Sequence, residues 1–131
     1  MRAAFVGLRS AWCAPAIVAD DLAALLAAST MSPHGPPVDA AANVAVRVAH
    51  RALALLARLR PSRWRATCLY RSVAECLALR ALGWPARVVI GVGNGAAPAE
   101  TVAHAWVECE GVRCRSTRGV AELETLATTR A

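Results

Sequence analysis

The segment that decides the fold is TCLYRSVAECLALRALGWPARVVIGV, residues 67–92. Thr67 is a favoured residue at a helix N-cap, and Gly83 followed by Pro85 is typical of a helix end. We therefore predict a helix over Cys68–Leu82. Its buried face is expected to consist of Leu69, Val73, Cys76 and Leu77. The β-branched run that follows, residues 86–92, predicts a strand.

A second strand is predicted downstream, over Thr101–Cys109, because its polar and apolar residues alternate. A glycine-rich loop, residues 93–98, should connect the two strands. Glu110 and Gly111 then predict a tight turn into a third strand, residues 112–117. One face of the second strand is expected to carry Val102, His104, Trp106 and Glu108.

Two helical segments are predicted upstream. Residues 1–30 show a loose helical pattern, with Asp20 and Asp21 near a helix start, and a proline-rich linker follows at residues 32–37. A second helix should begin at the capping residue Asp39 and stop before Pro61. The expected apolar faces are Ile17, Leu22, Leu25 and Leu26 in the first segment, and Val44, Val48, Leu55 and Leu59 in the second. Helices followed by an antiparallel sheet predict an α+β fold.

Composition limits the chain to one small domain. It has 131 residues, no lysine, 15 basic residues, 9 acidic residues and a net charge of +6. This length excludes a two-domain enzyme. Within the single domain 1–131 we expect a helical region over 1–59, a catalytic core over 60–117 and a tail over 118–131.

The expected location is the cytoplasm. No apolar run approaches the roughly 20 residues that span a bilayer, and no secretory signal is evident. Five cysteines, an odd number without a regular spacing, favour unpaired thiols in a reducing compartment.

Cys68 and His104 are the candidate catalytic residues. A thiol in the first helical turn lies at the positive end of the helix dipole, beside N–H groups that can hold an oxyanion. A histidine on the adjoining sheet can accept the thiol proton. Cys76 is expected in the core, and His34 and His50 are expected at the surface. Cys13, Cys109 and Cys114 lack the setting of a nucleophile.

The third member of such a site is less evident. If Glu110 and Gly111 form the turn, Thr117 lies opposite His104 and Ser116 lies beside it. Neither is a carboxylate. Glu108 shares the face of His104 but is expected to lie too far along the strand to bond the ring directly.

Seven arginines occur between Asp39 and Glu75 without any acidic residue: 47, 51, 58, 60, 63, 65 and 71. Two interpretations remain open, a solvated helix face with a basic loop, or a surface for an acidic or extended peptide or a nucleic acid. Only Trp64 and Tyr70 could stack on bases there, which argues against nucleic acid. No metal or other cofactor is expected, because the close pair Cys109 and Cys114 has no second pair at zinc spacing.

Several strings in the chain resemble one family. They are WRATCLYRSVA (64–74), LRALGWPA (79–86), IGV (90–92), AHAWVE (103–108) and Gly111. In this order they resemble the lasso-peptide leader peptidases of the transglutaminase-like superfamily, over roughly residues 60–116. The resemblance implies a transglutaminase- or papain-like core with Cys68 as nucleophile and His104 as base. Ser116 stands where the family has an aspartate.

The resemblance also implies an activity and partners. It implies a cysteine peptidase that removes the leader from a ribosomally made lasso-peptide precursor through a Cys68 thioester. The implied partners are the precursor, an ATP-dependent lasso cyclase and a separate leader-recognition protein, with neither nucleic acid nor membrane. Arg47, Arg51, Arg58 and Trp64 are the candidate surface for that partner or the leader. The alternative is a catalytically weak scaffold that couples leader-bound precursor to the cyclase.

Overall fold

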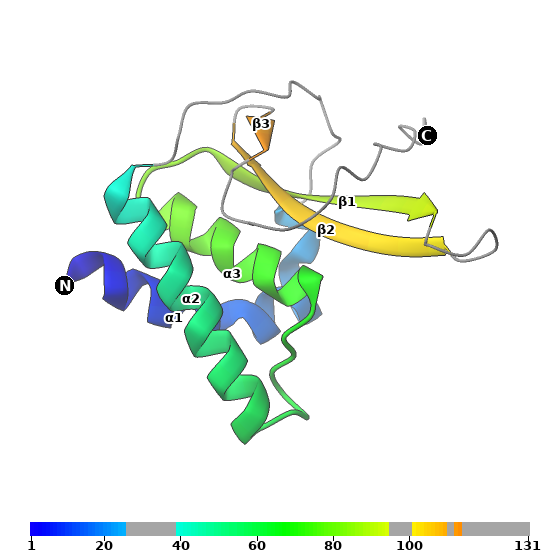
Figure 1. Cartoon of the computed structure of the whole chain (residues 1–131), viewed down its shortest axis with the longest axis horizontal. Helices are drawn as coiled ribbons and strands as arrows, with labels where there is room; N and C mark the ends of the chain where they lie inside the picture. Colours follow the sequence, from blue (N-terminus) through cyan, green and yellow to red (C-terminus); the bar gives the residue numbers. More distant parts are fainter. Residues whose placement is uncertain (26–38, 95–100, 110–111, 114–131) are drawn as a thin grey trace.

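The predicted α+β order is confirmed in a computed structural model, which describes residues 1–25, 39–94, 101–109 and 112–113. Within this part of the chain, three α-helices precede a three-stranded antiparallel sheet. The helices pack on one another, and the last of them contacts the two long strands (Figure 1).

Helix α1 (Arg2–Ala16) is shorter than the helical segment expected at the N-terminus. A π-helical turn (Ile17–Asp21) and a 3₁₀ turn (Leu22–Ala24) follow it. Pro15 lies inside the last turn of α1 and has no N–H to donate. At Asp21 the backbone leaves the helical region, with φ −140° and ψ 22°. No described α-helix begins at Asp20 and Asp21, contrary to expectation; only the short 3₁₀ turn starts after Asp21.

Helix α2 (Ala40–Leu59) has the predicted bounds. The Ala42 backbone N–H donates to Asp39 Oδ1 over 2.7 Å, which caps the helix start as expected. Among the described helices, α2 alone is long and apolar enough to cross a membrane, a feature that the sequence prediction missed. Its inner face nevertheless packs against α1 and α3.

The apolar stripe predicted for the buried face of α2 is wrong. Val44, Leu55 and Leu59 are 37%, 58% and 68% exposed. The buried residues are instead Ala42, Ala45, Val46, Ala49 and Leu53. Gly7 of α1 explains this choice, because a Cβ at Gly7 would lie 2.9 Å from Val48 Cβ and would collide with the Ala45 carbonyl oxygen. The two helices approach through small residues, and the larger side chains are left outside.

Helix α3 (Cys68–Ala81) lies at the centre of the fold and contacts α1, α2, β1 and β2. It ends as predicted, with Gly83 in the left-handed region at φ 91°. Val73 and Cys76 are fully buried as expected, whereas Leu69 and Leu77 are only partly buried. The remaining buried residues of α3 are Ser72, Ala74, Glu75, Ala78 and Leu79.

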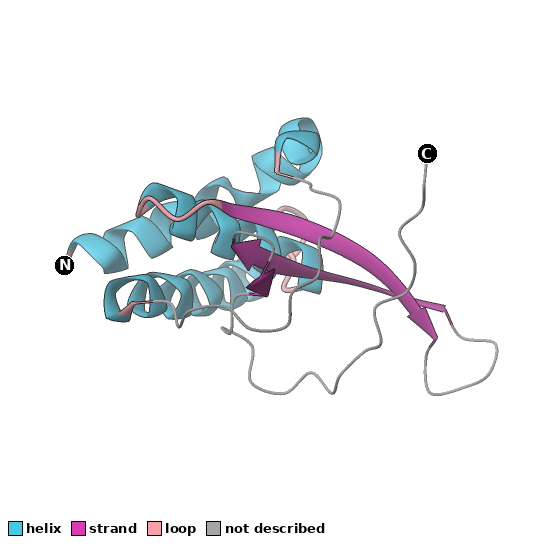
Figure 2. Cartoon of the chain, turned by 90° about the horizontal axis from the view of Figure 1, so that it is seen from above, coloured by secondary structure: helices cyan, strands magenta, loops and turns pink. Residues whose placement is uncertain are grey.

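The sheet consists of β1 (Ala86–Asn94), β2 (Thr101–Cys109) and β3 (Val112–Arg113), in that order. Cys109 pairs with Val112, as the predicted turn requires, and on its other side Cys109 pairs with Ala86. Strand β1 continues through Gly93 and Asn94, which the sequence pattern assigns to the loop. The arrowhead of β1 and the start of β2 project beyond the helices in both views (Figures 1 and 2). The predictions for residues 32–37, 95–98, 110–111 and 114–117 lie outside the described residues.

Candidate active site

Cys68 is the first residue of α3, as predicted from Thr67. Its thiol is free and half-buried, and it packs against the edge of the core. Thr67 has the extended backbone of an N-cap, but its side chain makes no capping hydrogen bond. The first-turn N–H groups of α3 therefore remain available to an oxyanion beside the thiol. Arg65 and Arg71 are exposed nearby in the sequence and add positive charge.

Cys76 has a different environment, which confirms its predicted place in the core. Its thiol is fully buried and donates to the Ala86 carbonyl oxygen over 3.4 Å. Burial raises the pKa of this thiol to about 11; Arg80 opposes the rise, and the Glu75 carboxylate adds to it. Cys76 is consequently protonated at neutral pH and unsuited to nucleophilic attack.

Strand β2 presents two distinct faces. Ala105, Val107 and Cys109 belong to the hydrophobic core. By alternation, His104, Trp106 and Glu108 occupy the other face. Glu108 accepts a hydrogen bond from Trp106 Nε1 over 2.9 Å.

The predicted pairing of the Cys68 thiol with the His104 imidazole stays a prediction. Helix α3, which begins at Cys68, contacts β2, which carries His104. Ser116, proposed as the third residue, lies outside the described residues, as do Thr117, Cys114 and His34.

The arginines of the candidate partner surface are exposed, but Trp64 is not. Arg47, Arg51 and Arg58 lie on the outer side of α2. Trp64 is only 1% exposed, so its assignment to a surface is wrong.

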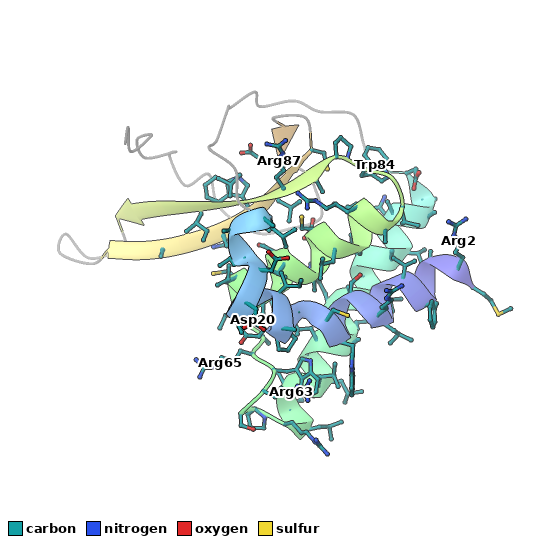
Figure 3. All side chains as sticks on the ribbon, turned by 180° about the vertical axis from the view of Figure 1, so that it is seen from behind. Arg2, Asp20, Arg63, Arg65, Trp84 and Arg87 are labelled. Atoms are coloured by element: carbon teal, nitrogen blue, oxygen red, sulfur yellow. The ribbon has the colours of Figure 1, made fainter. Side chains whose placement is uncertain are left out.

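Trp64 is buried because its ring packs against Trp12 of α1, with 5.1 Å between centroids. Arg63 stacks over Trp64 at 4.8 Å. Trp12, which is 57% exposed, is the aromatic residue that this region presents to solvent. Arg63 and Arg65 occupy the loop before α3, at the edge opposite Trp84 and Arg87 (Figure 3).

The surface position predicted for His50 is wrong. Its side chain is 23% exposed, and its Nε2 lies 3.3 Å from Oε2 of Glu75. The distance is that of an ion pair, although the geometry does not complete a hydrogen bond. The pair links α2 to α3. Glu75 is buried, and a buried carboxylate is costly unless cationic or polar groups lie nearby.

The remaining candidate ligands and nucleophiles are the other cysteines and any groups that could hold a metal. Cys13 and Cys68 are free, as expected, but Cys109 is disulfide-bonded, which contradicts the expectation that all five thiols are unpaired. In the described part of the chain, no three histidine, cysteine, aspartate or glutamate residues are grouped as a metal site.

Comparison with known proteins extends these observations. The family model of the transglutaminase-like superfamily matches residues 10–128, which include both Cys68 and His104. No curated protein and no solved structure matches the chain. The superfamily includes cysteine peptidases. With its α+β core and a free cysteine at the start of the central helix, the chain belongs to the transglutaminase-like superfamily.

Proposed function

We propose that the protein is a cysteine peptidase that removes the leader peptide from a lasso-peptide precursor. The observation that carries the proposal is the free thiol of Cys68 at the first position of α3, whose N-cap side chain leaves the helix end uncapped. Membership of the superfamily supports cysteine chemistry at this position. The leader-peptidase role follows from the resemblance of residues 60–116 to that family.

The proposed reaction begins with transfer of the Cys68 proton to His104. The thiolate attacks the carbonyl carbon that precedes the cleaved bond, and the first-turn N–H groups of α3 stabilise the oxyanion. When the oxyanion collapses, the C–N bond breaks and His104 returns the proton to the leaving amine. Water, deprotonated by His104, then hydrolyses the Cys68 thioester and releases the leader.

A surface on α1 and α2 is the proposed docking site for a separate leader-recognition protein. Neither helix contains an acidic residue. Besides the exposed Arg47, Arg51 and Arg58, the two helices carry several exposed apolar residues: Phe5, Leu8 and Trp12 in α1, and Leu55 and Leu59 in α2. Aromatic residues and arginine are enriched in protein interfaces, and this combination suits a partner with acidic and apolar side chains.

One observation favours the alternative of a scaffold that couples the precursor to the cyclase. By the resemblance, Ser116 occupies the position of the family aspartate, and a serine cannot stabilise an imidazolium as a carboxylate does. A scaffold thiol should react with iodoacetamide no faster than free cysteine near neutral pH, whereas an activated nucleophile reacts faster.

The proposed function is tested by cleavage of the cognate precursor in the presence of its leader-recognition protein. We expect Cys68→Ala and His104→Ala each to abolish cleavage, with circular dichroism unchanged. Cys13→Ala is the matched control, because Cys13 is also free and half-buried but lies in α1. Full activity of Cys68→Ala would exclude a peptidase that uses this thiol.

A further inference from the structure

The imidazole of His104 needs a group that fixes its orientation. In cysteine and serine acyl-transfer enzymes, neighbouring groups fix the orientation of the catalytic histidine. The following inference rests on the proposed function, because it concerns the base of the same reaction.

Trp106 lies against the imidazole. The ring centroids of His104 and Trp106 are 6.2 Å apart, and the ring planes differ by 22°. This is an offset-stacked arrangement within the range typical of interacting aromatic rings. The stacked indole therefore restricts rotation of the imidazole out of its plane.

The indole is itself held at two places. At one, its Nε1–H donates to Glu108 Oε1 over 2.9 Å, and Glu108 is only 7% exposed. A hydrogen bond to a carboxylate is stronger than one to a neutral acceptor, and burial shields it from competing water.

At the other, the six-membered ring covers Gly91, where a Cβ would lie 2.6 Å from Cη2 and 2.7 Å from Cζ3 of Trp106. Gly91 is also the cross-strand partner of His104. The indole therefore lies over Gly91, opposite His104. A residue with a Cβ at this position would collide with the ring.

We propose that Trp106 is the positioning residue of His104, and that Glu108 and Gly91 hold the indole in place. Trp106 acts on the reaction only through the orientation of the imidazole. If Trp106 only covered the sheet, its replacement would lower the stability of the fold. It would not change the effect of His104 on the reactivity of Cys68.

A double-mutant cycle on the full chain separates these roles. The measured quantity is the rate of Cys68 alkylation by iodoacetamide between pH 5 and pH 9, followed by peptide mass spectrometry. Cys76 serves as the slow internal reference, because it is buried. The variants are His104→Ala, Trp106→Ala, Trp106→Phe and the double variant of His104→Ala with Trp106→Ala. Trp84→Phe is the matched control, since Trp84 follows the opposite end of α3.

We expect His104→Ala and Trp106→Ala each to slow Cys68 alkylation at neutral pH by roughly tenfold or more, and the double variant to be no slower than either. Trp106→Phe keeps an aromatic face and should recover most of the rate. Trp84→Phe should react like the wild type. With wild-type folding verified by circular dichroism, this pattern supports the positioning role.

Two results overturn the inference alone. They are a wild-type alkylation rate in Trp106→Ala while His104→Ala is slow, and losses that add in the double variant. A different result, in which His104→Ala leaves Cys68 alkylation unchanged, refutes the proposed function and this inference with it. If Trp106→Ala does not fold, Gly91→Ala decides the question. Its added Cβ should displace the indole and slow alkylation, and an unchanged rate contradicts the proposal.

Discussion

Replacing Gly7 by alanine tests the close packing of α1 against α2. An added Cβ would lie 2.9 Å from Val48 Cβ and 3.0 Å from the Ala49 backbone nitrogen, and it would collide with the Ala45 carbonyl oxygen. These are backbone and Cβ atoms that cannot rotate away, so the helices have to separate. In an unconstrained helix, Gly→Ala is stabilising by about 1 kcal/mol.

The steric cost should exceed this gain. Overpacking a well-packed core typically costs about 1–3 kcal/mol, and more where the backbone has to move. Because the backbone has to move here, we take an overpacking cost of about 2–4 kcal/mol. After the helix gain of about 1 kcal/mol is subtracted, Gly7→Ala should lower the free energy of unfolding by a net of about 1–3 kcal/mol. For a chain of this size, this corresponds to a fall in melting temperature of roughly 4–12 °C.

The assay is thermal and urea denaturation followed by circular dichroism at 222 nm. Gly83→Ala is the comparison, because a Cβ added at Gly83 would meet no atom within 4 Å, although the backbone there has φ 91°. Its cost should come from backbone strain alone, about 1–2 kcal/mol. A Gly7→Ala protein that is as stable as the wild type, or more stable, would refute the close approach and the explanation of which α2 face is buried.

Two further predictions concern the core. Leu53→Ala should cost about 2–5 kcal/mol, because Leu53 is fully buried, whereas Leu59→Ala on the exposed stripe should change stability by no more than about 0.5 kcal/mol; equal losses in urea denaturation would contradict the assigned faces of α2. The pKa of Cys76 is raised from 9.0 to about 11, so the folded state binds the thiol proton more tightly than the unfolded state. This stabilisation is complete below pH 9 and is lost as the pH rises to 11. Relative to Cys76→Ala, the wild type should lose about 2 kcal/mol between pH 7 and pH 10.5; parallel stability curves for the two proteins would exclude this effect.

Local signals in the sequence are sufficient for the elements of the fold. Asp39 and Pro61 mark the ends of α2, and Thr67 and Gly83 mark the ends of α3. These ends can be predicted because helix capping and helix termination depend on residues within one turn. The alternation in Thr101–Cys109 likewise predicts β2 and its two faces. The position of Cys68 at a helix start, the central feature of the candidate site, is therefore available from the sequence.

Contacts between helices and strands cannot be predicted from such local signals. Val44, Leu55 and Leu59 form an apolar stripe on α2, yet the buried face is the alanine-rich one, because Gly7 lets the two backbones approach. His50 similarly pairs with Glu75 across two helices. Helical periodicity identifies which residues share a face, but it does not say which face meets a partner.

The site shows the same division. The sequence is enough to predict a free thiol at the start of the central helix, and to place His104, Trp106 and Glu108 on one face of a strand. That this face points away from the core, and that the indole of Trp106 lies over Gly91 and against His104, emerges only from the folded arrangement. Strand alternation fixes relative orientation along one chain segment, whereas packing across the sheet and against α3 depends on the shapes of residues distant in the sequence.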